Sequence, residues 1–243
     1  MVISIICLLM SITLPALTKA REQGKRVVCL SNMRGLTQCW MMYAFENDDR
    51  LCSADTDWDV PPNCHWVTDG PVIPSNEFGG TAEAIMAGVL WPYTSQTLDL
   101  YKCKSDQSDR LRSYALSTAM NGHPAGAFQH WSGIPQPSER MVVADAWSRT
   151  PWISGPFQPV KPYGTDGLTW HVWFGQNITA RHSDGCNLSL ADGHCEYFKY
   201  RDPRTIARAN DDMSEDRSAN DNRDALRFLE LTRCPLVMIT TIE

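Results

Sequence analysis

Hydrophobic residues follow two successive patterns over the first 47 positions of the chain. Residues 1–18 contain no charged side chain and are mostly apolar. From residue 19 to about Asn47, apolar residues recur every three or four positions, which is the pattern of a helix with one apolar face. Because no turn signal separates the two parts, the sequence predicts one long helix that ends near Asn47. Pro15 is expected to kink this helix, since proline removes a backbone donor.

The apolar segment of residues 1–18 has three interpretations. A cleaved signal peptide would need a basic region ahead of its apolar core, and a basic cluster directly after the apolar run is unusual for a buried core helix. We favour a membrane anchor, because the segment approaches the roughly 20 apolar residues that span a bilayer. Basic residues follow the span, which by the positive-inside rule would keep the rest of the chain in the cytoplasm unless a basic leader precedes Met1.

The residues beyond the long helix predict short elements separated by loops. Residues 51–80 are rich in Pro, Gly and Asp, and predict loops with a short strand at 64–68. A short helix is expected over 81–90, with Thr81 in position to cap its start. The run MVVAD at 141–145 predicts a buried strand, because β-branched residues favour strands.

The segment 181–198 carries the strongest local signal. More and less polar residues alternate on both sides of Asp192 and Gly193. An Asp-Gly pair between alternating residues favours a hairpin with a two-residue type I′ turn. Such a turn would pair Leu190 with Cys195.

Composition places the chain among ordinary globular proteins, but its charge is unevenly distributed. The 243 residues fit one domain with appendages, and their net charge of −6 argues against a nucleic-acid partner bound through a general basic field. Residues 1–45 sum to +4, so the remainder sums to −10. Residues 201–224 contain 12 charged positions among 24 and predict a solvated segment. This segment opens a charged C-terminal tail over 201–243, in which a short helix is expected.

Three parts of the sequence resemble one protein family. The run LLMSITLPALTKAREQGKRVVCLSNMRGLTQCWMMYAFEND is similar to the N-terminal helix of type IV pilin-like proteins and type II secretion pseudopilins. The segment LYKCKSDQSDRLRSYAL resembles a family region with a Cys-Pro-x-Asp turn before an Arg-Ser-Tyr strand, with Lys104 in place of the proline. His182, nine intervening residues, Asp192 and Gly193 match the H-x9-D-G signature of the prepilin-type processing-associated domain. The resemblance covers roughly residues 5–205.

The resemblance implies an α+β, pilin-like fold, with the long helix packed on an antiparallel β-sheet that has loop-rich insertions. It divides the chain into a transmembrane and stalk helix over 1–46, a globular head over 47–200 and the charged tail. The implied role is a structural pseudopilin-like subunit without catalysis, whose partners are other pilin-like subunits bundled through the N-terminal helix. The implied location is the inner membrane, crossed once, with the head in the periplasm or extracytoplasmic space. The family's leader and cleavage-site glycine have no match, so we expect the sequence to start downstream of the prepilin cleavage site.

The resemblance also raises calcium as a cofactor, because related pseudopilins bind it in a loop of the globular domain. Asp184 and Asp192 are the candidate ligands, since calcium prefers oxygen donors. Zinc is an alternative without the usual Cys-x2–4-Cys spacing, and its ligands would be Cys186, Cys195, His182 and His194. We favour a structural interpretation, in which Asp192 and Gly193 form the turn and His182 hydrogen-bonds across the base of the hairpin.

The nine cysteines cannot all pair within one chain. If the head is extracytoplasmic, disulfides such as Cys29–Cys103 and Cys52–Cys64 can form. Cys7 lies in the apolar segment and is expected to stay unpaired. In the alternative interpretation, several cysteines are buried thiols that act as small hydrophobic residues.

Two other function classes remain open from the sequence. The first is a membrane-anchored extracytoplasmic module that binds carbohydrate or protein through aromatic side chains in Pro- and Gly-rich loops; the candidates are Trp58, Trp66, Trp147, Trp152, Trp170 and Trp173. The second, with less support, is a metal-dependent hydrolase. No Gly-x-Ser-x-Gly, His-Glu-x-x-His or phosphate-loop motif occurs in the sequence.

Overall fold

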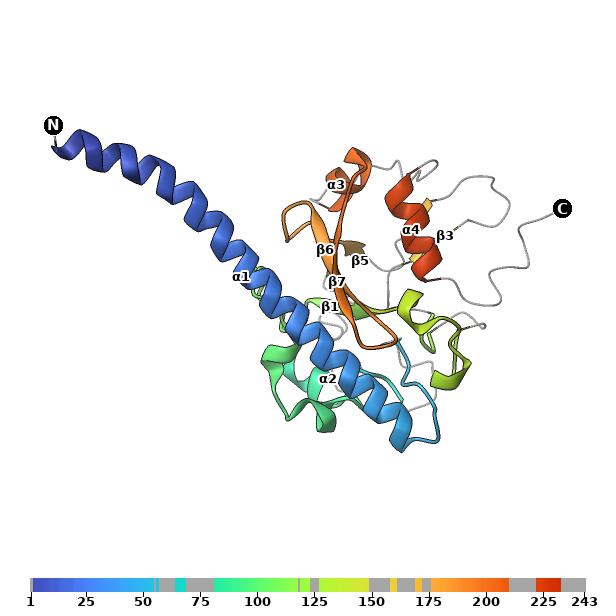
Figure 1. Cartoon of the computed structure of the whole chain (residues 1–243). Helices are drawn as coiled ribbons and strands as arrows, with labels where there is room; N and C mark the ends of the chain where they lie inside the picture. Colours follow the sequence, from blue (N-terminus) through green and yellow to red (C-terminus); the bar gives the residue numbers. More distant parts are fainter. Residues whose placement is uncertain are drawn as a thin grey trace.

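The computed structural model of the chain describes residues 2–54, 56, 64–68, 81–117, 119–122, 127–148, 158–160, 169–171, 176–209 and 222–232. A long N-terminal helix, α1 (Val2–Glu46), precedes a head of short elements (Figure 1). The other elements are α2 (Ala82–Met86), η1 (Trp91–Thr94), η2 (Leu98–Tyr101), β1 (Tyr114–Leu116), η3 (Trp131–Gly133), η4 (Pro137–Glu139), β2 (Met141–Ser148), β3 (Gln158–Val160), β4 (Thr169–His171), β5 (Gln176–Ile178), β6 (Gly185–Leu190), β7 (Cys195–Lys199), α3 (Pro203–Ala209) and α4 (Arg223–Leu231).

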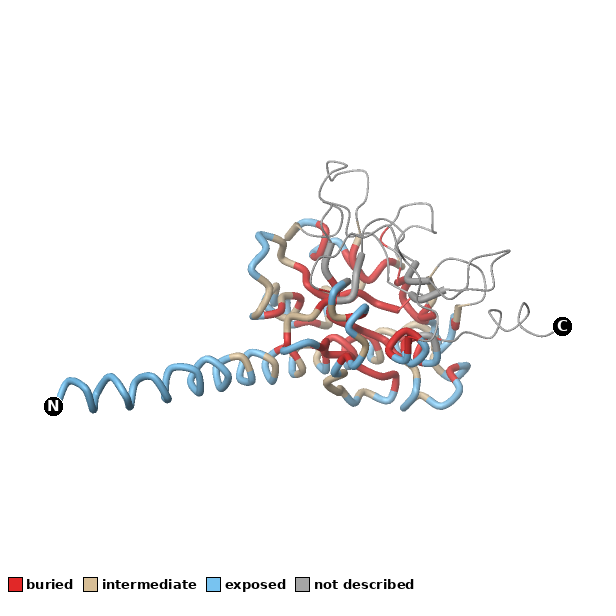
Figure 2. Tube along the Cα trace, turned by 90° about the horizontal axis from the view of Figure 1, so that it is seen from above, coloured by how far each residue is buried: buried red, intermediate tan, exposed pale blue. Residues whose placement is uncertain are grey.

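The two halves of α1 have different surroundings (Figure 2). The apolar first half is exposed, and the helix continues through Pro15. The second half buries residues at helical spacing against the head, among them Cys29, Met33, Leu36 and Trp40. The expected single helix is confirmed, and it ends one residue before the expected Asn47.

Within the described residues, α1 is the one helix long and apolar enough to cross a membrane. No part of its most apolar window is buried in the chain. An N-terminal signal sequence would meet the same criterion of length and composition. The finding is compatible with a single-pass anchor.

The central sheet is antiparallel, with strand order β1-β2-β6-β7, and β5 pairs with the end of β2. The strands β3 and β4 form a separate two-stranded ribbon. The strand expected over 141–145 is confirmed as the first part of β2, whereas of the Arg-Ser-Tyr segment only Tyr114 lies in a strand, β1. The coarse expectation of an α+β fold with a long N-terminal helix therefore agrees with the structure.

The strand β6 is buried on both faces, because α1 covers one and the pair α3 and α4 covers the other. Toward α1, the Ser189 hydroxyl lies 2.6 Å from the Thr37 hydroxyl, and the Asn187 side chain donates to the carbonyl of Arg26. Toward α3 and α4, the alternate residues of β6 join a second hydrophobic cluster that includes Phe228. The small polar residues of β6 thus mark the face against the helix.

The tail contains α3 and α4, and the segment expected to be solvated over 201–224 is so only in part, because Thr205, Asn222 and Asp224 are buried among its described residues. In α4, the side chains of Ala225, Phe228 and Leu231 are buried against the sheet. The buried Asn222 side chain caps α4 and also pairs with Thr205 at the start of α3. Both helices carry charged residues on their exposed faces. The buried apolar face has only a few residues, so the sequence pattern did not indicate it.

Two local expectations are corrected in the loop-rich part of the head. The helix expected over 81–90 is limited to α2, although Thr81 caps it through its side chain as expected. The strand expected over 64–68 is a single bridge between His65 and Ser53. With only one bridge, the segment has no ladder that would extend it into a strand.

The hairpin of β6 and β7 is present, but its register differs from the expected one. Ser189, not Leu190, pairs with Cys195. The amide of Gly193 donates to the carbonyl of Leu190, which closes a three-residue loop over 191–193. Gly193 alone in this loop has a positive φ, of 91°, whereas a type I′ turn needs two such residues. A three-residue loop with one left-handed residue shifts the pairing by one position.

Candidate functional site

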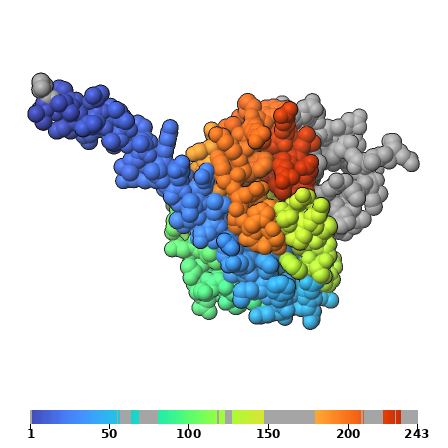
Figure 3. All heavy atoms as spheres, viewed as in Figure 1, coloured from blue at the N-terminus to red at the C-terminus, as the bar shows by residue number. Residues whose placement is uncertain are grey.

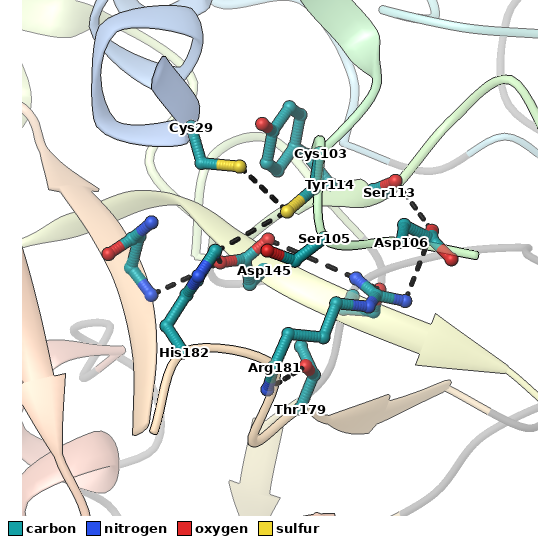
Figure 4. A network of polar contacts seen from close by, with 12 residues as sticks. Cys29, Cys103, Ser105, Asp106, Ser113, Tyr114, Asp145, Thr179, Arg181 and His182 are labelled. Carbon is teal, nitrogen blue, oxygen red and sulfur yellow. Dashed lines mark hydrogen bonds and ion pairs between the residues drawn. The ribbon is translucent and has the colours of Figure 1, made fainter. Parts of the chain in front are cut away.

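Four buried side chains from distant parts of the chain meet where α1 crosses the sheet (Figure 4). Cys29 comes from α1, Cys103 follows η2, Asp145 lies on β2, and His182 lies in the turn before β6. All four residues are 0–1% exposed. We call this set the Cys–His–Asp cluster.

The donor atoms of the Cys–His–Asp cluster lie close together. The sulfur atoms of Cys29 and Cys103 are 2.7 Å apart, and both cysteines are free thiols. Nε2 of His182 lies 3.4 Å from Sγ of Cys103 and 3.3 Å from Oδ2 of Asp145. The two sulfur atoms and one imidazole nitrogen all lie within 4.8 Å of one another, as a metal ion would require.

A second layer of polar groups orients the cluster. Nδ1 of His182 lies 3.2 Å from Oε1 of Glu22, and that carboxylate also accepts a hydrogen bond from Ser105. The backbone amide of Asn187 donates to Oδ2 of Asp145. His182 is therefore held between carboxylates from α1 and from β2.

Arg181 links this layer to the segment after η2. Its Nη2 lies 3.1 Å from Oδ2 of Asp106, and its Nη1 donates to the carbonyl of Ala146. The same Nη1 lies 3.9 Å from Oδ1 of Asp145. Asp106 also accepts a hydrogen bond from Ser113, so the Cys-x-x-Asp segment is tied to the sheet through this arginine.

Electrostatic interactions favour the charged imidazolium form of His182. Burial opposes a charge on His182, but hydrogen bonds to Asp145 and Cys29 outweigh it and raise the histidine pKa to about 9. Contact with Cys103 lowers the pKa of Cys29 to about 5, and the same contact raises the pKa of Cys103. Burial raises the pKa of Glu22, but the hydrogen bonds from Ser105 and His182 more than offset this and lower it.

The motif residues have the expected structural roles only in part. Asp192 shapes the turn, because its carboxylate accepts the backbone amide of His194. Gly193 supplies the left-handed backbone. The expected hydrogen bond of the His182 ring across the hairpin base is wrong, since the ring points to α1 and β2 and only its backbone contacts Gly185.

The structure does not bring together the metal ligands suggested by the sequence. Asp184 and Asp192 stand at opposite ends of β6, and six strand residues separate them by about 20 Å. Of the suggested zinc ligands, Cys186 is buried on the face toward α3 and α4, while the ring of His182 faces α1. His194 is exposed at the other end of the hairpin.

The two suggested disulfide pairs have different outcomes. Cys29 and Cys103 are brought together as free thiols inside the Cys–His–Asp cluster. Cys52 and Cys64 are near enough for Cys64 to help raise the pKa of Cys52, after the larger effect of burial. Cys7 is exposed on α1.

The tryptophan candidates for ligand binding are mostly outside the described side chains. Trp58, Trp152 and Trp173 lie outside the described residues, and so do the side chains of Trp147 and Trp170. Trp66 is fully buried, its indole nitrogen donates to the carbonyl of Ala54, and the Arg112 guanidinium lies over its ring. Trp66 is therefore part of the core.

Sequence reasoning missed the acidic partners of the cluster. Asp145 ends the apolar run MVVAD, and a carboxylate in a buried strand is a signal for a paired or ligating group. Glu22 is the only acidic residue among the first 45. A single carboxylate in an otherwise basic segment indicates a specific side-chain partner for that carboxylate. The four side chains of the cluster are only 0–1% exposed among the described residues.

Comparisons with known proteins add no relative to this picture. No family model, no curated protein and no solved structure matches the chain. The similarity to pilin-like proteins therefore stands on the sequence motifs themselves.

Proposed function

We propose that the chain is a structural, pilin-like subunit of a type II secretion or type IV pilus-like assembly, without catalysis. It is anchored in the inner membrane by the first half of α1, with the head in the extracytoplasmic space. The observation that carries this proposal is the division of α1 into an exposed apolar half and a half packed on the head (Figure 3).

The exposed half of α1 is unsuited to water. Ten large apolar side chains between Val2 and Leu17 are 49–77% exposed, and they surround the helix rather than forming one stripe. Covering one such side chain gains about 1.5–3 kcal/mol. A helix that is apolar all round belongs in lipid or among other helices.

The charges that follow the apolar half mark where the helix leaves the bilayer. Lys19, Arg21 and Lys25 are exposed on α1 directly after the last apolar turns. Long basic side chains at the end of an apolar span extend their charged groups to the membrane interface, and the placement of the head outside the cytoplasm rests on the resemblance to pilin-like proteins. The acidic remainder of the chain, with its sum of −10, is then held away from the membrane surface.

In the proposed role, assembly needs only lateral contacts between helices. Apolar halves of neighbouring copies pack together, while the buried second half fixes each head to its helix. The buried Cys–His–Asp cluster belongs to that junction and faces no substrate.

Membrane extraction of the full chain tests the anchoring. In bacterial cells, we expect the unaltered chain to stay in the membrane pellet after an alkaline carbonate wash. Leu9→Arg combined with Ile12→Arg should release most of it, because each central arginine costs about 2.5–3.5 kcal/mol on insertion. Val27→Arg, at an exposed position beyond the span, is the matched control. Release of the unaltered chain by carbonate would contradict the proposal.

A further inference from the structure

The Cys–His–Asp cluster contains the donor types that zinc prefers. Structural zinc sites use cysteine sulfur and histidine nitrogen in a tetrahedron, and aspartate oxygen also serves as a ligand. Here two sulfurs and one imidazole nitrogen lie within 4.8 Å of one another, and a carboxylate oxygen of Asp145 lies 3.3 Å from the same nitrogen (Figure 4). Polar and charged groups are costly to bury unless they pair or bind a metal.

Two of the donor spacings fit a tetrahedral zinc ion. With the usual bond lengths, such an ion holds nitrogen and oxygen about 3.3 Å apart, sulfur and nitrogen about 3.6 Å apart, and two sulfurs about 3.8 Å apart. Nε2 of His182 lies 3.3 Å from Oδ2 of Asp145 and 3.4 Å from Sγ of Cys103. The two sulfurs are 2.7 Å apart, so zinc binding requires the Cys29 sulfur to move by about 1 Å.

The surroundings of the cluster match those of a metal site. Histidine ligands usually bond to a carboxylate through their second nitrogen, which fixes the ring and exposes the other nitrogen to the metal. Glu22 stands in this position against Nδ1 of His182. The Asn187 amide fixes Asp145, whose Oδ1 is buried and accepts no hydrogen bond.

We propose that Cys29, Cys103, His182 and Asp145 together bind one zinc ion. The ion joins α1 to the loop after η2, to β2 and to the turn that carries the motif histidine. Its role is structural, because all four ligands are buried and no position faces solvent. The zinc site does not depend on the proposed pilin-like role, so either one can be wrong while the other is right.

Binding exchanges protons and involves no electron transfer. The cysteines and the histidine release to solvent whatever protons they carry at the site, and two thiolates, the imidazole and the carboxylate surround the ion. The competing fate of the same sulfurs is a disulfide, which releases two protons and two electrons to an oxidant.

Metal analysis of the full chain, purified in detergent with reductant, tests the site. After zinc loading and removal of excess metal, we expect one zinc per chain. Cys29→Ser and His182→Gln should each lower the bound zinc at least tenfold. Cys39→Ser is the matched control, because Cys39 is also buried on α1 but contacts the carbonyl of Tyr93 outside the cluster. It should keep one zinc per chain.

Cobalt(II) loading of the unaltered chain keeps the test independent of how the variants fold. We expect a sulfur-to-cobalt absorption band in the near ultraviolet and the visible bands of a tetrahedral ion. The proposal is overturned if the reduced chain binds no zinc and shows no such bands. It is equally overturned if chain isolated without reductant holds a Cys29–Cys103 disulfide and fails to bind zinc after reduction.

Discussion

Nδ1 of His182 lies 3.2 Å from Oε1 of Glu22, so the motif histidine contacts the N-terminal helix across 160 residues of sequence. The same ring contacts Asp145 on β2 through Nε2. One imidazole therefore connects the long helix to the central strand of the head. The H-x9-D-G signature places its histidine at this junction and its Asp-Gly pair at the far end of the hairpin.

Removing the charge of Glu22 should loosen the junction. In Glu22→Gln, the acceptor of His182 on α1 loses its charge, and we expect the detergent-solubilised chain to lose about 1–2 kcal/mol of unfolding free energy, since Glu22 is partly exposed. Urea unfolding followed by circular dichroism measures this loss. His194→Gln is the control, because His194 contacts Asp192 on an exposed turn. An equal effect of both substitutions would contradict the importance of the junction.

Two glycines should respond in opposite directions to alanine. A Cβ at Gly88 would lie 2.1 Å from the carbonyl oxygen of Trp66 and 2.9 Å from Cα of Val67, which are backbone atoms that cannot easily move. We expect Gly88→Ala to cost about 1–3 kcal/mol. A Cβ at Gly24 on α1 would meet no atom within 4 Å, so Gly24→Ala should add about 0.5–1 kcal/mol of helix stability. Thermal unfolding of both variants measures these effects.

The hairpin turn should tolerate asparagine better than valine. Gly193 has a φ of 91°, and a Cβ there meets only the Met41 sulfur at 3.7 Å. The free-energy cost of a substitution therefore comes from the strained backbone conformation and not from a steric clash. Gly193→Val should cost about 1–2 kcal/mol, and Gly193→Asn clearly less, because asparagine enters the left-handed region more readily. Similar losses in urea unfolding for both variants would contradict the assigned turn.

The Asp106–Arg181 pair should make stability depend on pH in the acid range. Burial raises the pKa of Asp106, but Arg181 and the hydrogen bonds from Ser113 and Ser108 outweigh it and lower the pKa below the usual 3.8. The unfolded state therefore binds the proton first as pH falls. The contribution is fully present well above pH 3.8 and is lost as pH falls through the lowered value.

Urea midpoints between pH 5 and pH 2.5 measure this dependence. Asp106→Asn cannot titrate at this position, so its midpoint should fall less steeply with acid than that of the unaltered chain. Identical slopes for the two proteins would show that the pair contributes nothing to acid stability.

Local patterns predicted the long helix and the strand β2, because helical spacing and β-branched composition act within a few residues. The hairpin was predicted but not its register, which depends on whether Asp192 adopts a positive φ. The sequence raised the Cys29–Cys103 pair only as one of several. It could not indicate that Asp145 and His182 join them, because these contacts form only when α1 packs on the sheet. Tertiary packing likewise buries one face of α4. That face has only three apolar residues, Ala225, Phe228 and Leu231, and the charged residues around them obscure the pattern in the sequence.

The central claim, that copies of the chain assemble through the apolar half of α1, is tested most directly by cross-linking in membranes. Single cysteines are placed one at a time at positions 5–12 of the Cys7→Ser chain, next to the unaltered chain with its own exposed Cys7. A short bifunctional thiol reagent is then applied. We expect covalent dimers at positions three or four residues apart, which mark one helix face, and none in the Cys7→Ser parent. Membrane-embedded chain that yields no dimer at any position would contradict the claim.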